Sequence, residues 1–250
     1  MPAPDLKHPN HTEAKHQYWA VVPAAGTGVR MGGTLPKQYL PLAGRTVIEH
    51  TLQRLLDHEK ITGVVVAIAA NDGYFADIKA RLVDHGKPCL TAVGGAERFQ
   101  SVLNALQVLG QVASATDWVL VHDAVRPCIR REDIDRLIHV LQGQVAGGLL
   151  ALPLHDTIKR VDADAYVQET LDRSLLWRAL TPQMFRLAAL SEALTRVLTD
   201  RVQVTDECAA MEHAGAVPCI VQGADDNIKI TQPQDLRLAG FYLSQQEKQQ

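Results

Sequence analysis

The sequence predicts an α/β fold built on a doubly wound, mostly parallel sheet. Short runs of apolar and β-branched residues alternate with segments whose apolar residues recur at steps of three and four. The short runs are continuously apolar, as expected for parallel strands that are covered on both faces. A glycine-rich turn follows the first run. This alternation is typical of βαβ units.

The first half of the chain supplies the regular part of this pattern. We expect buried strands over 18–24, 62–70, 89–93 and 117–123, and helices over 46–58, 98–110 and 131–142. Thr46 is followed three residues later by Glu49, a spacing that fits a capping box. The first of these helices should therefore begin at Thr46.

The pattern changes after Pro153. Residues 154–185 alternate polar and apolar side chains, with a turn expected near 162–165. We interpret this stretch as an extended β-arm, bounded at about 154–182, that leaves the sheet. An arm of this kind has no core of its own, so we expect it to pack on a second subunit and form a homodimer. An ordinary long hairpin on the monomer is the alternative.

The rest of the chain returns to the sheet as one domain over 18–250. We expect helices over 187–200 and 205–215, strands over 217–223 and 226–231, and a closing helix with Pro233 in its first turn. Residues 1–17 are polar and rich in histidine and proline, which predicts a disordered leader.

Composition limits the classes of function. The chain has 250 residues, 46% of them hydrophobic, and a formal net charge of −3, so no basic surplus indicates nucleic acid as a partner. No stretch reads as a signal peptide or a membrane span, so we expect a cytoplasmic protein without a membrane partner. Four cysteines are scattered without a CxxC pair and are expected to be structural thiols: Cys89, Cys128, Cys208 and Cys219.

The glycine-rich turn at 26–33 fits neither standard phosphate loop. A dinucleotide fingerprint would place a glycine three residues after Gly28, where Met31 stands. A P-loop would supply a lysine after its second glycine, and "GTGVRMGG" has none there. What is left is a glycine turn with two cations, Arg30 and Lys37, which could neutralise a triphosphate that loses pyrophosphate. The alternative is a flexible turn with solvated charges.

Two later segments carry further candidates. Asp123 ends an apolar strand, where α/β sheets build their sites, and a carboxylate there is a natural Mg²⁺ ligand or a helix cap. Arg126 could bind phosphate or brace the loop, and His122 is expected to support the strand end through a hydrogen bond. Asp226 and Lys229 would point to opposite faces of a regular strand, so a shared site would need a kink or a bulge.

Taken together and in this order, five motifs resemble the 2-C-methyl-D-erythritol 4-phosphate cytidylyltransferase family. They are "PAAGTGVRM…PKQY", "VHDAVRP", "ALTPQ", "TDE" and "DNIKIT", and the resemblance covers about residues 18–243. It implies a Rossmann-like nucleotidyltransferase that transfers CMP from CTP to a sugar-alcohol phosphate, methylerythritol phosphate, with Mg²⁺ or another divalent cation. The chemistry needs no protein nucleophile.

The resemblance also implies roles for residues. Arg30 and Lys37 would hold the triphosphate, Lys229 would contact the α-phosphate, and Asp123 would bind the metal, with Asp226 a weaker candidate. The cytidine-binding set would be Ala24, Ala25, Gly26, Gly95 and Ser101. The acceptor-binding set would be Arg126, Thr157, Arg173 and Thr181, with Thr157 and Arg173 on an arm that crosses to the second subunit of a dimer.

Two positions depart from the family pattern, and three alternatives stay open. Ala96 stands where relatives often carry Asp, and Val29 replaces the first of two basic residues seen in some relatives. A ribitol 5-phosphate cytidylyltransferase would share the fold and the chemistry. A nucleotide-binding module that has lost catalysis is disfavoured because both cations, Arg30 and Lys37, and Asp123 are retained. A nicotinamide-dependent dehydrogenase is disfavoured by the glycine spacing.

Overall fold

The computed structural model describes residues 16–26, 35–82 and 86–248. Most of the predicted leader, and Arg30 in the glycine-rich turn, lie outside these residues.

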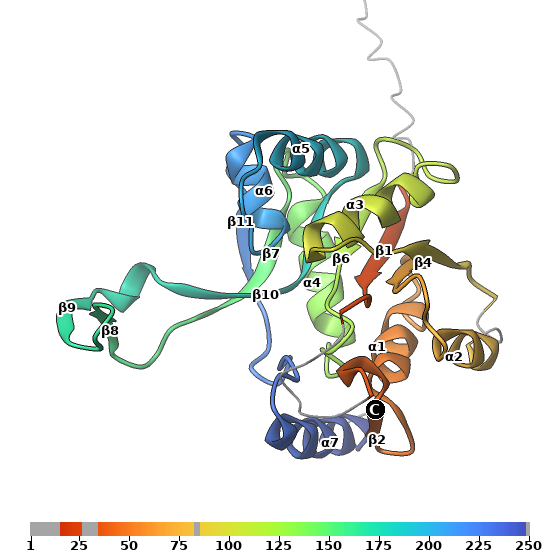
Figure 1. Ribbon diagram of the computed structural model, residues 1–250, viewed down its shortest axis with the longest axis horizontal. Coiled ribbons are helices and arrows are strands. Elements are labelled where there is room, and N and C mark those ends of the chain that lie inside the picture. Colours follow the sequence, from red (N-terminus) through yellow and green to blue (C-terminus); the bar gives the residue numbers. More distant parts are fainter. Residues whose placement is uncertain (1–15, 27–34, 83–85, 249–250) are drawn as a thin grey trace, which may run out of the picture.

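A seven-stranded sheet forms the centre of the molecule, in the order β11-β7-β10-β6-β1-β4-β5 (Figure 1). The strands are β1 (Tyr18–Pro23), β4 (Ile61–Ile68), β5 (Cys89–Val93), β6 (Trp118–Val121), β7 (Gly148–Pro153), β10 (Trp177–Arg186) and β11 (Cys219–Gln222). Strand β10 runs antiparallel to β6 and β7, and the other neighbours are parallel. The predicted doubly wound, mostly parallel sheet is confirmed.

Helices cover both faces of this sheet. Helices α1 (Val47–Leu56), α2 (Phe75–Arg81) and α4 (Arg131–Leu141) pack in one apolar cluster with one face of the sheet. Helices α3 (Arg98–Leu109), α5 (Leu187–Asp200) and α6 (Glu207–His213) pack in a second cluster with the other. Helix α7 (Pro233–Glu247) closes a smaller third cluster beside the two-stranded β2 (Pro41–Leu42) and β3 (Arg45–Thr46).

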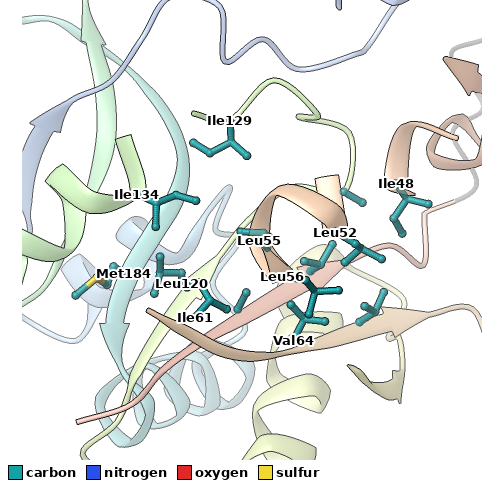
Figure 2. Close-up of a cluster of buried hydrophobic side chains, with 14 of the residues drawn as sticks. Ile48, Leu52, Leu55, Leu56, Ile61, Val64, Leu120, Ile129, Ile134 and Met184 are labelled. Atoms are coloured by element: carbon teal, nitrogen blue, oxygen red, sulfur yellow. The ribbon is translucent and has the colours of Figure 1, made fainter. Parts of the chain in front are cut away.

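The apolar stripe of α1 shows how sequence spacing becomes packing. Ile48, Leu52, Leu55 and Leu56 recur at helical steps and lie over the sheet strands (Figure 2). All four are fully buried or nearly so. The predicted capping box begins the helix, with Thr46 as the N-cap and its partner at Glu49.

The arm is a long excursion from the sheet (Figure 1). The hairpin of β8 (Ile158–Val161) and β9 (Val167–Leu171) is followed by a short 3₁₀ turn, η4 (Arg173–Leu175). From Trp177 onward the chain is β10, paired with β7 in the main sheet. The excursion therefore ends several residues before the predicted bound at about 182, because the second half of the alternating segment is a central strand.

Three details of the sequence prediction need correction. Residues 226–231 do not form a strand, because the amide of Ile230 bonds to the carbonyl of Val125 and the neighbouring groups are held by side chains. Strand β7 and helix α2 were not predicted. The expectation of unpaired thiols is confirmed for all four cysteines. Within the described ranges, the helices are all too short or too polar to cross a bilayer.

Candidate active site

A cavity of about 530 Å³ opens at the carboxyl ends of β1 and β6. Segments that are far apart in sequence line it, namely 23–26 at the end of β1, 37–38, 95–98 with Ser101, 123–125 after β6, and 229 with 231. In an open α/β sheet the carboxyl ends of the strands are where ligands bind. The fold therefore brings the predicted motifs to one place.

Eight of the predicted site residues line this cavity. They are Ala24, Ala25, Gly26, Lys37, Gly95, Ser101, Asp123 and Lys229. Arg126 and Thr181 lie directly behind the cavity wall, since both bond to Asp123. Thr157 and Arg173 are exposed on the arm, and neither lines the cavity of its own chain.

Close backbone approach shapes the part of the cavity assigned to the nucleoside. The amide of Gly95 donates to Oγ of Ser101 at 3.0 Å. A Cβ on Gly94 would lie 2.2 Å from Cβ of Ala25, so only glycine lets these two loops meet. Gln38 fixes the loop that carries Ala25, because its Nε2 donates to the carbonyls of Ala24 and Gly26 at 2.7 and 3.0 Å. Sequence reasoning gave no role to Gln38, although it stands in the "PKQY" motif.

Three cations surround Asp123 at the end of β6. Nζ of Lys229 lies 3.0 Å from Oδ2, and Nε of Arg126 lies 3.2 Å from the same oxygen. Arg98 approaches the other oxygen, Oδ1, at 3.2 Å. Burial alone would raise the pKa of this carboxyl, but the three cations outweigh burial and hold the pKa well below its usual value. Asp123 is therefore ionised throughout the physiological range.

A buried chain of hydrogen bonds supports this strand end. The amide of Asp123 donates to Oγ1 of Thr181 at 3.1 Å, and the same hydroxyl lies 3.0 Å from Nδ1 of His122. Nε2 of His122 lies 3.1 Å from the carbonyl of Arg126, which can only accept, so Nε2 carries the proton and Nδ1 accepts from the hydroxyl. Burial lowers the pKa of His122 to about 4. A neutral His122 supports the loop, as the sequence predicted.

The segment that carries Lys229 is fixed by side chains. Nη1 of Arg126 donates to the carbonyl of Asn227 at 2.8 Å, and Nδ2 of Asn227 donates to the carbonyl of Thr181 at 2.8 Å. These bonds hold an irregular segment from which Lys229 reaches Asp123.

Asp226 faces a different set of partners. Arg130 binds it through two nitrogens, with Nη2 at 2.7 Å from Oδ2, and Nε2 of Gln246 donates to the same oxygen at 2.8 Å. Asp226 does not line the cavity. Its carboxylate thus joins α4 and α7 to the Lys229 segment, and its predicted role as a metal ligand stays a prediction.

Besides Gln38, two residues of the cavity region were missed by sequence reasoning. Arg98, the first residue of α3, lines the cavity and contacts Asp123. Glu207, the first residue of α6, lies behind Arg98 and pairs with it at 2.7 Å. Glu207 stands in the "TDE" motif, so a signal was present, but nothing in the sequence indicates its partner.

Comparison with known proteins agrees with this geometry. A protein of Vibrio vulnificus (strain YJ016) named 2-C-methyl-D-erythritol 4-phosphate cytidylyltransferase is 50% identical over 228 residues, covering 91% of this chain and 95% of that protein. A protein of the same name from Pseudomonas fluorescens is 51% identical over 220 residues, covering 88% and 92%. A crystal structure of 4-diphosphocytidyl-2C-methyl-D-erythritol synthase superposes with a TM-score of 0.79 at 34% identity, covering 92% and 99%.

Fold, cavity and relatives together define this chain as a nucleotidyltransferase. A family model matches residues 18–245. The chain belongs to the 2-C-methyl-D-erythritol 4-phosphate cytidylyltransferase (IspD) family.

Proposed function

We propose that this chain transfers CMP from CTP to 2-C-methyl-D-erythritol 4-phosphate, giving 4-diphosphocytidyl-2-C-methyl-D-erythritol and pyrophosphate. The names of its relatives support the reaction. The observation that carries it in this chain is the meeting of Lys37, Asp123 and Lys229 in one cavity with the glycine-lined nucleoside wall. The cytoplasmic location stays a prediction from composition.

The chemistry that suits this cavity is direct in-line displacement. A phosphate oxygen of the acceptor attacks the α-phosphorus of CTP, a new P–O bond forms, and the bond to pyrophosphate breaks. Such a transfer depends on positioning and on neutralising charge. Nζ of Lys37 lies 3.4 Å from the carbonyl of Ile230, the residue after Lys229, so the two lysines lie in the same part of the cavity. We assign both to the phosphates, with Arg30 as a further predicted contact.

Asp123 fits a site for Mg²⁺ that enters the cavity bound to the phosphates of the nucleotide. Mg²⁺ is commonly held by one or two carboxylates together with substrate phosphates and water. Among the described residues no cluster of three or more His, Cys, Asp or Glu could hold a metal alone. Two carboxylates line the cavity, those of Glu97 and Asp123, and Asp123 is the one at the end of β6. We assign the metal to Asp123, in a site completed by phosphates, and leave Asp226 as the weaker candidate. When bound, the metal would neutralise the phosphates and help pyrophosphate to leave.

We further propose that two copies share their acceptor sites through the arm. Thr181 and Arg126 lie behind the cavity of one copy, while Thr157 and Arg173 sit on its exposed arm. The arm also exposes large apolar side chains, with Tyr166 71% and Leu175 85% exposed. An arm that exposes such residues is expected to be covered in an assembly. Thr157 and Arg173 of one copy would then complete the acceptor site of the other.

Pyrophosphate release tests the reaction. Purified protein is incubated with CTP and Mg²⁺ and either 2-C-methyl-D-erythritol 4-phosphate or ribitol 5-phosphate. Release with the methylerythritol compound alone supports the proposal. Release with ribitol 5-phosphate alone would keep the chemistry and change the acceptor, and no release with either would overturn the proposed reaction.

A further inference from the structure

Glu207 is a buried carboxylate beside the cavity with an unusual environment. Its side chain is 0% exposed, and its Oε1 accepts from Nη1 of Arg98 at 2.7 Å. Its other oxygen, Oε2, is buried without a hydrogen-bond partner among the described residues. Burial of an ionised carboxylate costs free energy unless the carboxylate is paired, so the buried position of Glu207 needs a structural or functional explanation.

Glu207 is not needed to attach helix α6 to the sheet. Asp206, the residue before Glu207, already caps the helix by accepting from the amide of Ala209 at 2.9 Å. Gln183 of β10 donates to Asp206 at 2.9 Å and accepts from the amide of Cys208 at 2.8 Å. The start of α6 is therefore fixed to the sheet by neutral and capping contacts, and Glu207 is left to act on Arg98.

Arg98 spans the distance from Glu207 to the cavity. Its Nη1 binds Glu207, while Nε and Nη2, on the opposite edge of the guanidinium, lie 3.2 Å from Oδ1 of Asp123. The side chain is 28% exposed and lines the cavity. Burial opposes its charge, but Glu207 and then Asp123 raise the pKa of Arg98, so it is always a cation.

We infer that Arg98 is a phosphate-binding residue for the nucleotide triphosphate, and that Glu207 is the positioning residue that holds it. Arg98, Arg126 and Lys229 all form ion pairs with the carboxylate of Asp123. A triphosphate entering the cavity offers these cations a stronger anionic partner. Glu207 anchors Nη1, which leaves the Nε and Nη2 edge in the bidentate arrangement that suits phosphate oxygens. The inference rests on the proposed function in that the cavity takes CTP.

Ligand affinity without the acceptor tests this pair. Isothermal titration of the full chain measures Kd for CTP with Mg²⁺ and, separately, for inorganic tripolyphosphate. We expect Arg98→Ala to weaken both by about 10–100-fold, because a hydrogen bond between charged groups is lost. Glu207→Gln keeps the shape but removes the anchoring charge, and should weaken both by about 3–10-fold. Glu212→Gln, at an exposed position on the same helix, is the matched control and should leave both unchanged.

The double variant separates positioning from mere stability. If Glu207 acts through Arg98, then Glu207→Gln adds nothing to the loss of affinity in an Arg98→Ala background. Thermal unfolding of each variant checks folding, and Arg98→Lys replaces Arg98→Ala if the latter does not fold. Additive losses, or a Glu207→Gln variant with lowered Tm and unchanged Kd, would overturn the role of Glu207. An Arg98 variant with unchanged Kd would overturn the whole inference.

The two ligands distinguish this inference from the proposed function. Wild-type protein that binds tripolyphosphate through Arg98 but does not bind CTP would support Arg98 as a phosphate site and overturn the choice of nucleotide. Wild-type protein that binds neither ligand would overturn both.

Discussion

Nζ of Lys229 lies 3.0 Å from Oδ2 of Asp123, across two segments that meet only in the folded chain. Residues 226–231, which carry the lysine, are irregular, and their groups bond to Arg126, Val125 and Thr181. A regular strand would have turned Lys229 to the other face from Asp226. In the structure Lys229 lines the cavity and Asp226 does not, so the two side chains lie in different places although the segment is not a strand.

Removal of this lysine should affect turnover far more than folding. We expect Lys229→Ala to lower kcat by about 10²–10³-fold, as for the loss of a group that stabilises transition-state charge. Asp123 keeps Arg98 and Arg126 as partners, so Tm should change by only a few degrees. Pyrophosphate release and thermal unfolding measure the two effects, with Lys79→Ala on α2 as the control. A Lys229→Ala variant with near-normal kcat would remove the lysine from the site.

Asp226 can be tested as a structural clamp against its role as a metal ligand. As a clamp, it joins Arg130, the N-cap residue of α4, to Gln246 of α7, so Asp226→Asn should lower Tm by several degrees. The Mg²⁺ concentration that gives half-maximal turnover should stay unchanged. Arg130→Ala should destabilise similarly, and the double variant should be little worse than either alone. A large rise in the Mg²⁺ requirement with unchanged Tm would instead support Asp226 as a ligand.

Glu49 should make stability depend on pH in the acid range. Burial opposes ionisation, but bonds from Arg81 and Thr46 lower the pKa of Glu49 to about 2. The unfolded value is about 4.3, so the unfolded chain takes up this proton first as pH falls. The stabilisation is complete above about pH 5 and is lost toward pH 2. Glutamine can still serve in the capping box, so Glu49→Gln removes mainly the charge.

The measurement for Glu49 is Tm against pH. Wild type should exceed Glu49→Gln at pH 7, and the difference should shrink steadily between pH 5 and pH 3. Because Arg81 is 56% exposed, added salt should also reduce the difference at pH 7. A difference that is constant over this pH range would show that the charge of Glu49 does not stabilise the fold.

A shared acceptor site can be tested by mixing two inactive variants. Lys229→Ala disables the cavity, and Arg173→Ala disables the arm. If Arg173 acts in the cavity of the other copy, a mixed dimer has one site with both changes and one with neither. Subunit exchange of equal amounts should then restore about a quarter of wild-type activity. Mixing that restores nothing, although mass measurement shows mixed dimers, would place Arg173 outside the shared site.

Local pattern predicted most of the sheet and most of the helices. The runs at 18–24, 62–70, 89–93 and 117–123 correspond to β1, β4, β5 and β6, because continuous apolar character marks strands covered on both faces. Helix α2 was missed since it buries little beyond Phe75 and Ile78.

Long-range pairing explains what the sequence left unpredicted at the site. The motifs predicted that Lys37, Asp123 and Lys229 would share a cavity, and the structure places them in one. The sequence could not predict that Arg98 pairs with Glu207, or that Arg130 binds Asp226. Each of these contacts joins elements whose relative position is set by packing in the folded chain. A buried charge in a motif shows that a partner exists, and only the fold shows which one.

Strand β10 connects the arm to the cavity wall. It starts at the exposed Trp177, at the root of the arm, passes Thr181 behind Asp123, and ends buried against β6. The link between the arm and the cavity is thus one strand, whose pairing with β7 is irregular between Ala179 and Gln183. In the proposed pair of copies, a displacement of one arm would reach the hydroxyl of Thr181 in the same chain through β10, so contact with the neighbour and the shape of the proposed acceptor site would be coupled within each chain.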